Sequence, residues 1–453
     1  MLVLRLNEYS VRSKGDGLMT TAAQDYGTVP NRWVQAVLAL IIMLFISPYE
    51  YTFTLFESPI AKAHHWALPG VALTFTIYVL VASFFMIPSG FWSDRWQPRW
   101  FTTVAGAITG LGWIMSAHAQ TLPELYLAYG IGSLGPGYIY ANSVNNALKW
   151  FPEAHRRGLA VGLIDMGFGA GSALFIPFLA GVIKSGPFGY QTAFTEMGIA
   201  MIVVIVIVAQ FLHYPQKGWL PEGFSPELER QQRLHSRVAN ATQDLGPRDV
   251  LKTWQFWLAW IGMALITAAG LMVTAHIVDM AKVDVLVAGA VVGVAAATLS
   301  RIPNGLMRWV AGIVSDYIGR ELSMLIAFVI CGLSLFFMAQ THNGTLFIIL
   351  AMVAMGTWGP LFTLFPALVG DYFGRPHSGI NYGMLYTAKG IGGVFAGFIA
   401  AAIFHSTHSW TTDFDIAAVF AIVAGIIGIF LKPPGTRLVH GTRNSHEHSS
   451  AAS

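Results

Sequence analysis

Two basic residues, Arg308 and Lys389, lie inside long apolar segments of the sequence. Arg308 occurs in LSRIPNGLMRWVAGIVSD, and Lys389 occurs in INYGMLYTAKGIGGVFAGF. A cation at the centre of a membrane-spanning helix costs roughly 2.5–3.5 kcal/mol on insertion scales, so such residues usually face a cavity or a transport pathway. Arg308 offers a planar fork that can bind a carboxylate bidentately, whereas Lys389 is a compact point charge. Together they predict a binding site for a small anion.

Two carboxylates occupy comparable positions in the first half of the chain. Glu50 lies in ISPYEYTFTLFE, and Asp165 lies in GLIDMGFGAG, where the glycines allow helices to approach closely. A carboxylate inside a membrane either takes up a proton, because desolvation disfavours its charge, or stays ionised beside a cation. Glu50 is therefore a candidate proton site or a fixed salt-bridge partner, and for Asp165 we favour charge balance. If Glu50 and Asp165 are fixed salt-bridge partners, Arg308 and Lys389 are structural residues and do not bind a substrate.

The elements that hold these residues are predicted by composition. The chain has 453 residues, of which 55% are hydrophobic and only 11% are charged, against roughly 25% charged in a soluble domain. Apolar runs of about twenty residues, enough to cross roughly 30 Å of hydrocarbon, recur along the chain. These features predict an all-α membrane protein and exclude a barrel, which needs short alternating segments. The single cysteine, Cys331, excludes disulfides and thiolate metal sites.

The apolar runs predict twelve transmembrane helices. Their expected bounds are 33–56, 68–91, 101–119, 125–148, 158–183, 194–212, 254–278, 286–314, 322–339, 346–369, 382–404 and 416–431. The longest hydrophilic interval divides them into two groups of six. We therefore predict a cytoplasmic N-terminal tail (1–31), a first six-helix half (32–213), a central cytoplasmic loop (214–250), a second six-helix half (251–432) and a disordered cytoplasmic tail (433–453).

The distribution of basic residues predicts the orientation. Loops that follow even-numbered spans are basic where they are charged, through Arg95, Arg99, Arg156, Arg157, Arg320 and Arg375. Odd-numbered connections carry at most one lysine each. By the positive-inside rule, both termini and the central loop lie in the cytoplasm, and the protein is a multi-pass component of the cytoplasmic (inner) membrane.

The two halves of the sequence repeat a pattern. GFWSDRWQPRW follows the second span and GIVSDYIGRE follows the eighth, so that Asp94 and Asp316 hold equivalent places. KWFPEAHRRGLAVGLIDMGFGAG and DYFGRPHSGINYGMLYTAKGIGG also match, at almost the same distance in sequence as the two Ser-Asp motifs. In this alignment Phe168 corresponds to Lys389. Long-range duplication of this kind is typical of transporters built from two six-helix halves, and it argues against a channel or receptor.

The motif G-x-x-S-D-R after the second span, echoed after the eighth, resembles the loop signature of the major facilitator superfamily. From residue 31 to about residue 432 the chain resembles the oxalate/formate antiporter family and its monocarboxylate-transporting relatives, with NNALKWFPEAHRRGLAVG, TWGPLFTLFP and NYGMLYTAKG. The resemblance implies a midplane site between two pseudo-symmetric six-helix bundles, in which Arg308 and Lys389 hold the substrate carboxylates. It also implies an aromatic lining, although each residue alone is more simply a packing aromatic: Tyr51, Tyr140, Trp358 and Tyr386.

The chain departs from the antiporter pattern at positions that affect coupling. That family tends to carry glutamine at Glu50, an uncharged residue at Asp165, and tyrosine at Phe168 and Phe362. We therefore predict a secondary active transporter of small carboxylates that works by oxalate/formate-type antiport. The alternative is proton-coupled symport of a monocarboxylate such as lactate, acetate or formate, and a transporter-like sensor or channel is a remote third.

Charged residues at the cytoplasmic helix ends are candidates for gating, because they can latch the two halves in one state; the alternative is that they only orient the chain. These are Asp94, Arg95, Asp316 and Arg320. His276 and Asp279 are expected to be ordinary residues at the outer boundary of the seventh span; the alternative is that they line the outer mouth or titrate at moderately acid pH. No metal-ligand spacing, nucleophile elbow or phosphate loop occurs, so we expect neither an enzyme nor a cofactor or metal. The expected partners are a small carboxylate, protons in the symport case and the lipid bilayer, without nucleic acid, and the chain is expected to function as a monomer.

Overall fold

The computed structural model describes residues 30–216, 219–225, 244–285, 288–374 and 377–434. Most of both predicted tails and the middle of the predicted central loop lie outside the described residues. Within the described ranges every regular element is a helix. The predicted all-α class is confirmed.

Twelve helical passes form the described bundle, and several consist of two or three consecutive helices. The first half contains α1 (Arg32–Tyr51) with α2 (Phe53–His64), α3 (Leu68–Arg95), α4 (Pro98–Ala117), α5 (Leu122–Gly132) with α6 (Leu134–Trp150), α7 (Ala154–Ile183) and α8 (Gly189–Ala209). After the short α10 (Pro247–Val250), the second half contains α11 (Trp254–Asp284), α12 (Gly289–Leu299) with α13 (Arg301–Ile318), α14 (Arg320–Ala339), α15 (Gly344–Trp358) with α16 (Leu361–Phe373), α17 (Ser378–Val394) with η1 (Phe395–Ile399) and α18 (Ala400–Thr407), and α19 (Thr411–Phe430).

Ten of these passes are long and apolar enough to cross a membrane. The other two are α4 and the α5–α6 pass, which lie among the rest of the first half. In the α5–α6 pass the lower hydropathy has a clear cause, because α6 carries Asn142, Asn145 and Asn146. Polar residues of this kind often join transmembrane helices by hydrogen bonds. Here the Asn142 amide donates to Thr102 Oγ1 of α4 at 3.2 Å.

Four passes in the described bundle consist of two α-helices joined at a short break, and in three of them a proline lies at or just after the break. The exception is the break between α1 and α2 at Thr52, where Pro48 and Pro59 lie inside the two helices. α5 gives way to α6 at Ser133, with Pro136 in the first turn of α6. α12 gives way to α13 at Ser300, where Pro303 fits the first turn of the new helix. Proline lacks a backbone N–H and clashes with the preceding turn, so it ends or restarts a helix. Pro360 plays the same part between α15 and α16. Interrupted helices are typical of transporter binding sites.

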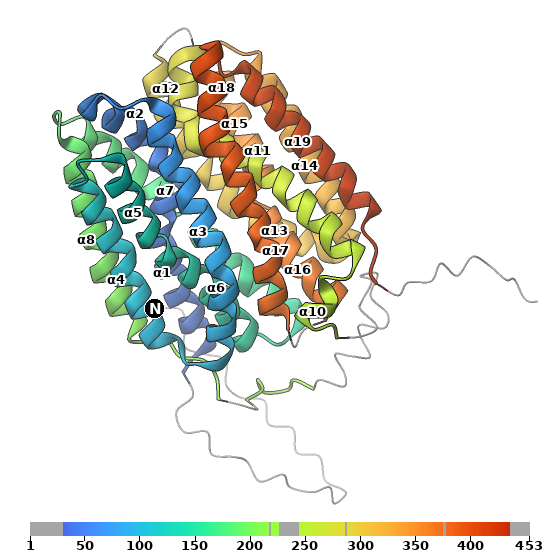
Figure 1. Cartoon of the computed structure of the whole chain (residues 1–453). Helices are drawn as coiled ribbons and strands as arrows, with labels where there is room; N and C mark the ends of the chain where they lie inside the picture. The colour runs from blue at the N-terminus through green and yellow to red at the C-terminus, as the bar shows by residue number, and fades with distance from the viewer. Residues whose placement is uncertain (1–29, 217–218, 226–243, 286–287, 375–376, 435–453) are drawn as a thin grey trace, which may run out of the picture.

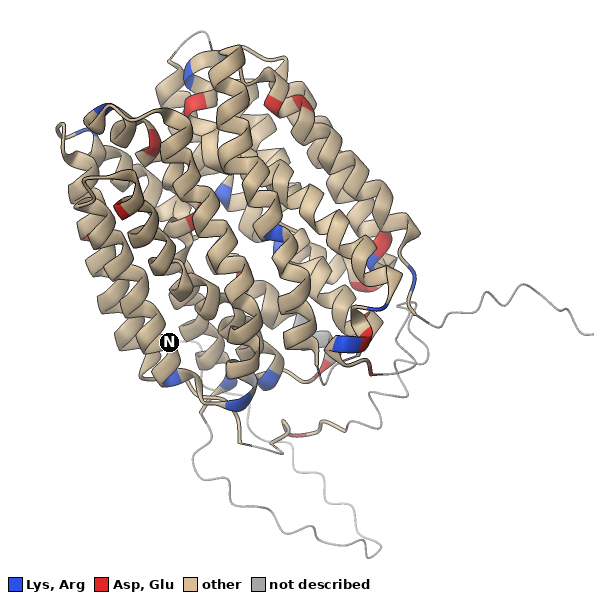
Figure 2. Cartoon of the chain, in the orientation of Figure 1, with Lys and Arg blue, Asp and Glu red and all other residues tan. Residues whose placement is uncertain are grey.

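The two halves stand side by side (Figure 1), with α3 against α17 and α7 against α13. The first described helix begins and the last one ends at the same end of the bundle, which we call the tail face; the opposite end is the far face. Figure 2 shows that most basic positions lie at the tail face.

Glycine allows α7 and α13 to approach closely beside the future site. A methyl group on Gly305 would lie 2.7 Å from the Ala170 Cβ, and one on Gly169 would lie 2.9 Å from Arg308 Nε. Both separations are too short for real side chains, so a larger residue at either position would push the helices apart. The close approach expected from GLIDMGFGAG is confirmed.

Candidate functional site

Lys389 of α17 is paired with Glu50 of α1 across the boundary between the halves. The Lys389 ammonium donates to Glu50 Oε2 at 2.6 Å and to the Tyr386 hydroxyl at 3.1 Å. The Tyr78 hydroxyl donates to the same Glu50 oxygen at 2.9 Å. Glu50 is fully buried and Lys389 is 3% exposed, so each charge depends on the other for compensation.

Arg308 of α13 is paired in the same sense with Asp165 of α7. Its Nη1 lies 3.1 Å from Asp165 Oδ2, and both side chains are buried. Its Nη2 donates to the Tyr51 hydroxyl at 2.9 Å and to Asn304 Oδ1 at 3.1 Å. The second half therefore supplies two cations and the first half supplies two carboxylates, all within the membrane-spanning bundle.

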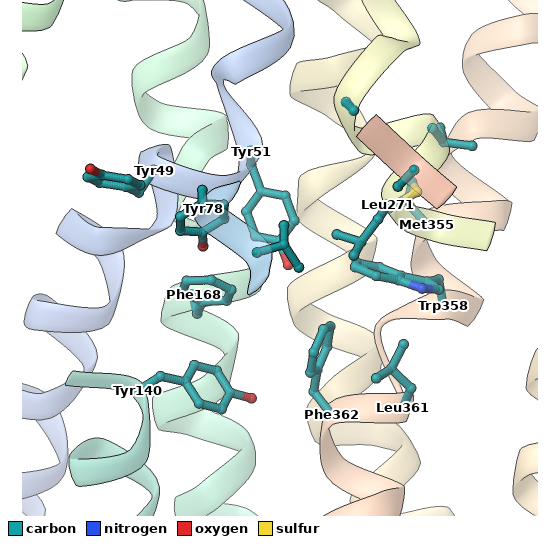
Figure 3. Packing of buried hydrophobic residues seen from close by; sticks show 14 of the residues in the cluster. Tyr49, Tyr51, Tyr78, Tyr140, Phe168, Leu271, Met355, Trp358, Leu361 and Phe362 are labelled. Atoms are coloured by element: carbon teal, nitrogen blue, oxygen red, sulfur yellow. The ribbon is translucent and has the colours of Figure 1, made fainter. Parts of the chain in front are cut away.

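Aromatic side chains project into the space between the halves (Figure 3), and several of their rings lie close to the two cations. The Arg308 guanidinium carbon lies 4.3 Å from the centre of the Phe362 ring, and Lys389 Nζ lies 5.0 Å from it. Tyr140 of α6 faces this group, with ring centres 5.3 Å from Phe168 and 5.6 Å from Tyr386. Ring faces attract cations and repel anions, so these contacts hold the two basic groups in place without neutralising them.

A small cavity of about 10 Å³ adjoins the Glu50–Lys389 pair. Tyr78, Tyr140 and Phe168 are among its lining residues. It has room for about one water molecule, so a carboxylate can enter only if the halves or the aromatic side chains move. In this conformation Arg308 and Lys389 are balanced by the protein's own carboxylates, Asp165 and Glu50.

The structure brings seven of the eight predicted binding and coupling residues into this cluster: Arg308, Lys389, Tyr51, Tyr140, Tyr386, Glu50 and Asp165. Trp358 lies one layer behind. Its indole Nε1 donates to the carbonyl of Ile266 at 2.8 Å, and its ring meets Phe362 edge-on at 5.2 Å. Trp358 therefore supports Phe362 and makes no hydrogen bond to either cation in the described structure.

The predicted gating residues lie at the tail face, where Arg95 and Arg320 make contacts inside their own halves. The Arg95 guanidinium covers the Phe91 ring at 3.5 Å. Arg320 pairs with Asp316 at 2.6 Å and with Asp371 at 3.1 Å. An acid four residues before a base forms such a pair by helix geometry alone. The side chain of Asp94 lies outside the described residues, and a gating role for these residues stays a prediction.

A second set of contacts joins the halves nearer the far face. His276 Nδ1 of α11 lies 3.1 Å from Glu57 Oε2 of α2, and both side chains are buried. Its Nε2 lies 2.9 Å from the carbonyl oxygen of Ala396; a carbonyl can only accept, so Nε2 carries a hydrogen. The Ser58 hydroxyl donates to Asp279 at 2.8 Å. We call Glu57, Ser58, His276 and Asp279 the far latch.

Sequence reasoning missed the far latch and one further buried cation, Arg301. His276 and Asp279 were expected to be ordinary boundary residues, whereas the structure makes them the second-half members of this latch. Glu57, the partner of His276, lies on the other half and 219 residues away in sequence, so nothing in the local sequence of either residue indicates that they pair. Arg301 did leave a local signal, because it precedes Arg308 by seven residues and so lies on the same helical face.

Breaking the far latch is expected to open the far face. His276→Ala leaves Glu57 buried without its partner, and this favours conformations in which water reaches the carboxylate. In a Cys331→Ser background, spin labels at the exposed positions Lys62 and Val283 should move apart, giving a longer and broader distance distribution. Labels at Trp100 and Tyr317, exposed near the tail face, provide the matched pair and should not separate. Identical distributions at Lys62 and Val283 with and without His276 would contradict the latch.

Asp165 is expected to be essential for stability. Asp165→Asn leaves the Arg308 guanidinium buried without its carboxylate, a loss of about 3–5 kcal/mol for pairs of this kind. Thermal unfolding in detergent measures it. The matched control is Asp316→Asn, because Asp316 is 44% exposed in its pair with Arg320 and should cost about 1 kcal/mol or less. Equal losses in the two variants would rule out a special role for Asp165.

Comparison with known proteins finds a family model and a relative that each cover most of the chain. The family model described as "Major Facilitator Superfamily" matches residues 38–305 and 292–451. The oxalate:formate antiporter of Oxalobacter formigenes is 30% identical over 413 residues, covering 90% of this chain and 94% of that protein. Apicoplast pyruvate carrier 1 of Toxoplasma gondii is 23% identical over 336 residues, covering 61% and 60%. Monocarboxylate transporter 11 of Mus musculus is 36% identical over 107 residues, 23% of each chain.

Proposed function

This chain belongs to the major facilitator superfamily, and from that premise we propose that it carries small carboxylate anions across the cytoplasmic membrane by alternating access. It is a transporter and not an enzyme. In the proposed orientation the tail face is cytoplasmic and the far face is outside. Rocking of one half against the other exposes the site between α1, α7, α13 and α17 to each side in turn.

The observation that carries this proposal is the pairing of both central cations with carboxylates from the opposite half. Arg308 meets Asp165 at 3.1 Å, and Lys389 meets Glu50 at 2.6 Å. A carboxylate substrate presents the same chemical group as these partners, so it can replace either one without leaving a cation unbalanced. Arg308 then binds the carboxylate with its fork, and Lys389 adds a second charged donor.

The geometry favours proton coupling through Glu50. When a substrate carboxylate takes Lys389, the displaced Glu50 is a buried carboxylate without a cation, and taking up a proton removes its charge. Once the substrate and proton leave, Glu50 returns to Lys389 and the two central pairs are neutral again. The empty carrier can therefore close and reorient, which net uptake of a monocarboxylate with a proton requires.

Carboxylate exchange is the second candidate. It is the activity named for the relative from Oxalobacter formigenes, and one observation in this chain favours it. Arg301 is buried near the central pairs, and no described carboxylate forms an ion pair with it. With three cations and two carboxylates, the empty site carries one excess positive charge. A bound monoanion balances it, so a loaded carrier would reorient more readily than an empty one.

Transport into vesicles distinguishes the two couplings. Purified protein is reconstituted and offered labelled formate, acetate, lactate and oxalate, with or without internal anion and with or without a pH gradient. Symport predicts uptake into empty vesicles driven by an acidic exterior. Exchange predicts uptake that needs internal anion and ignores the gradient. If none of the four anions enters above protein-free vesicles under either condition, the proposal of carboxylate transport is wrong.

A further inference from the structure

Arg301 is a buried cation of the same helix as Arg308. It begins α13 immediately after the break at Ser300, and only 1% of it is exposed. Seven residues are almost two helical turns, so Arg301 and Arg308 share a face of α13 and are separated by roughly 10 Å along its axis. Because α12 starts at the far face and α13 ends at the tail face, Arg301 lies on the far side of Arg308.

The guanidinium of Arg301 lacks the compensation that the other two cations have. Its Nε and Nη1 are buried without a hydrogen-bond acceptor among the described residues; the same two atoms of Arg308 also lack one, but Arg308 has a carboxylate beside it. Its described side-chain contact is with Tyr51, where the guanidinium carbon of Arg301 lies 4.5 Å from the centre of the ring. Arg308 and Lys389, by contrast, each meet a carboxylate within 3.1 Å. Buried charged donors without acceptors are costly, so a purely structural arginine would be paired.

Tyr51 separates Arg301 from the central site and contacts both arginines. Its ring face receives Arg301, and its hydroxyl accepts a hydrogen bond from Arg308 at 2.9 Å. Figure 3 shows Tyr51 projecting from the end of α1 into the space between the halves. A rotation of this one side chain, at the α1–α2 break, would let a single anion pass from one guanidinium to the other.

We propose that Arg301, with Tyr51, forms an additional binding position for carboxylate anions on the far side of the central site, which the substrate occupies between the far face and Arg308. This inference rests on the proposed function, because it concerns the same anion. The free Nε and Nη1 donors offer the edge of a guanidinium that a carboxylate binds through two oxygens. The three cations Arg301, Arg308 and Lys389 and the two carboxylates Glu50 and Asp165 have a net charge of one positive unit. A monoanion brings this net charge to zero and is therefore the preferred ligand.

The test compares transport from the two faces. Right-side-out and inverted vesicles containing the wild type, Arg301→Gln or Arg301→Lys are offered labelled formate, acetate, lactate and oxalate. Arg301→Gln should raise the half-saturating concentration about tenfold or more from the far face, the change expected for loss of one charged hydrogen bond. From the tail face the value should stay within about threefold, because the anion reaches Arg308 first. Arg301→Lys should recover most of the loss.

Equal half-saturating concentrations for Arg301→Gln and the wild type at the far face would overturn the inference, as would equal increases at both faces. A second measurement uses only the wild type and therefore does not depend on whether a variant folds. In the wild type, phenylglyoxal modification of Arg301, followed by mass spectrometry, should slow when a transported anion is present. A modification rate that the anion leaves unchanged would also overturn the inference while leaving carboxylate transport intact. If the wild type transports none of the four anions, the proposed function itself fails.

Discussion

Replacing Arg308 by glutamine should reduce carboxylate transport by about a hundredfold or more. Truncating one partner of a buried charge pair costs roughly 2–5 kcal/mol, and each 1.4 kcal/mol is about a factor of ten. Arg308→Lys should also be impaired, because the ammonium keeps the charge but loses the planar fork. Initial rates of labelled-anion uptake into vesicles measure both effects. Arg99→Gln is the control, since Arg99 is exposed and its Nε donates to Gln210 Oε1 at 2.9 Å.

A loss of folding is separated from a loss of function by a second substitution. In Arg308→Gln, Asp165 is left as a buried carboxylate without a cation, which destabilises the protein. The double variant Arg308→Gln/Asp165→Asn has no unpaired charge at this pair and should regain thermal stability. It should still fail to transport, because no guanidinium remains to bind the substrate. Recovery of transport together with stability would show that Arg308 only balances Asp165.

Replacing Glu50 by glutamine should remove the acceleration of uptake by external acid. In the wild type, uptake is expected to rise as the external pH falls, because a protonated Glu50 releases Lys389 to the substrate. Glutamine has the same shape and can still accept from Lys389 and Tyr78, but it cannot take up a proton in this range. Exchange between loaded vesicles should stay within about threefold of the wild type. The measurement is the initial uptake rate across a series of external pH values.

The control for this substitution is Glu124→Gln, at the start of α5, where the carboxylate is exposed and accepts from the Gln120 backbone N–H at 2.7 Å. Its pH profile should match that of the wild type. Unchanged pH dependence in Glu50→Gln would exclude Glu50 as the proton site. Exchange would then be the coupling that the remaining observations favour.

The fold was largely predictable because the signals that specify it are local. Apolar runs of membrane-spanning length, the repeated Ser-Asp motif at Asp94 and Asp316, and the charges of short loops each depend on a few neighbouring residues. The least apolar passes, α4 and α5–α6, were still predicted because flanking polar loops delimit them. The buried cations Arg308 and Lys389 stood out for the same local reason.

The pairing inside the site was not predictable, because it depends on packing between halves. Nothing in the sequence indicates that Glu50 meets Lys389 whereas Asp165 meets Arg308; either combination satisfies charge balance. The role of His276 was hidden likewise, since its partner Glu57 lies on the other half. Arg301 lies near the middle of the predicted span 286–314, seven residues before Arg308, so the criterion that singled out Arg308 could have found it; the structure shows that it is only 1% exposed.

Equilibrium binding to the purified protein tests the central claim most directly, because it needs neither a gradient nor an assumed coupling. Labelled formate, acetate, lactate and oxalate are offered to the wild type and to two charge-balanced variants, Arg308→Gln/Asp165→Asn and Glu50→Gln/Lys389→Gln. The wild type should bind at least one of the anions saturably, and both folded variants should bind it at least about tenfold more weakly. Wild-type affinity in either folded variant would contradict the claim that these two cations hold the substrate.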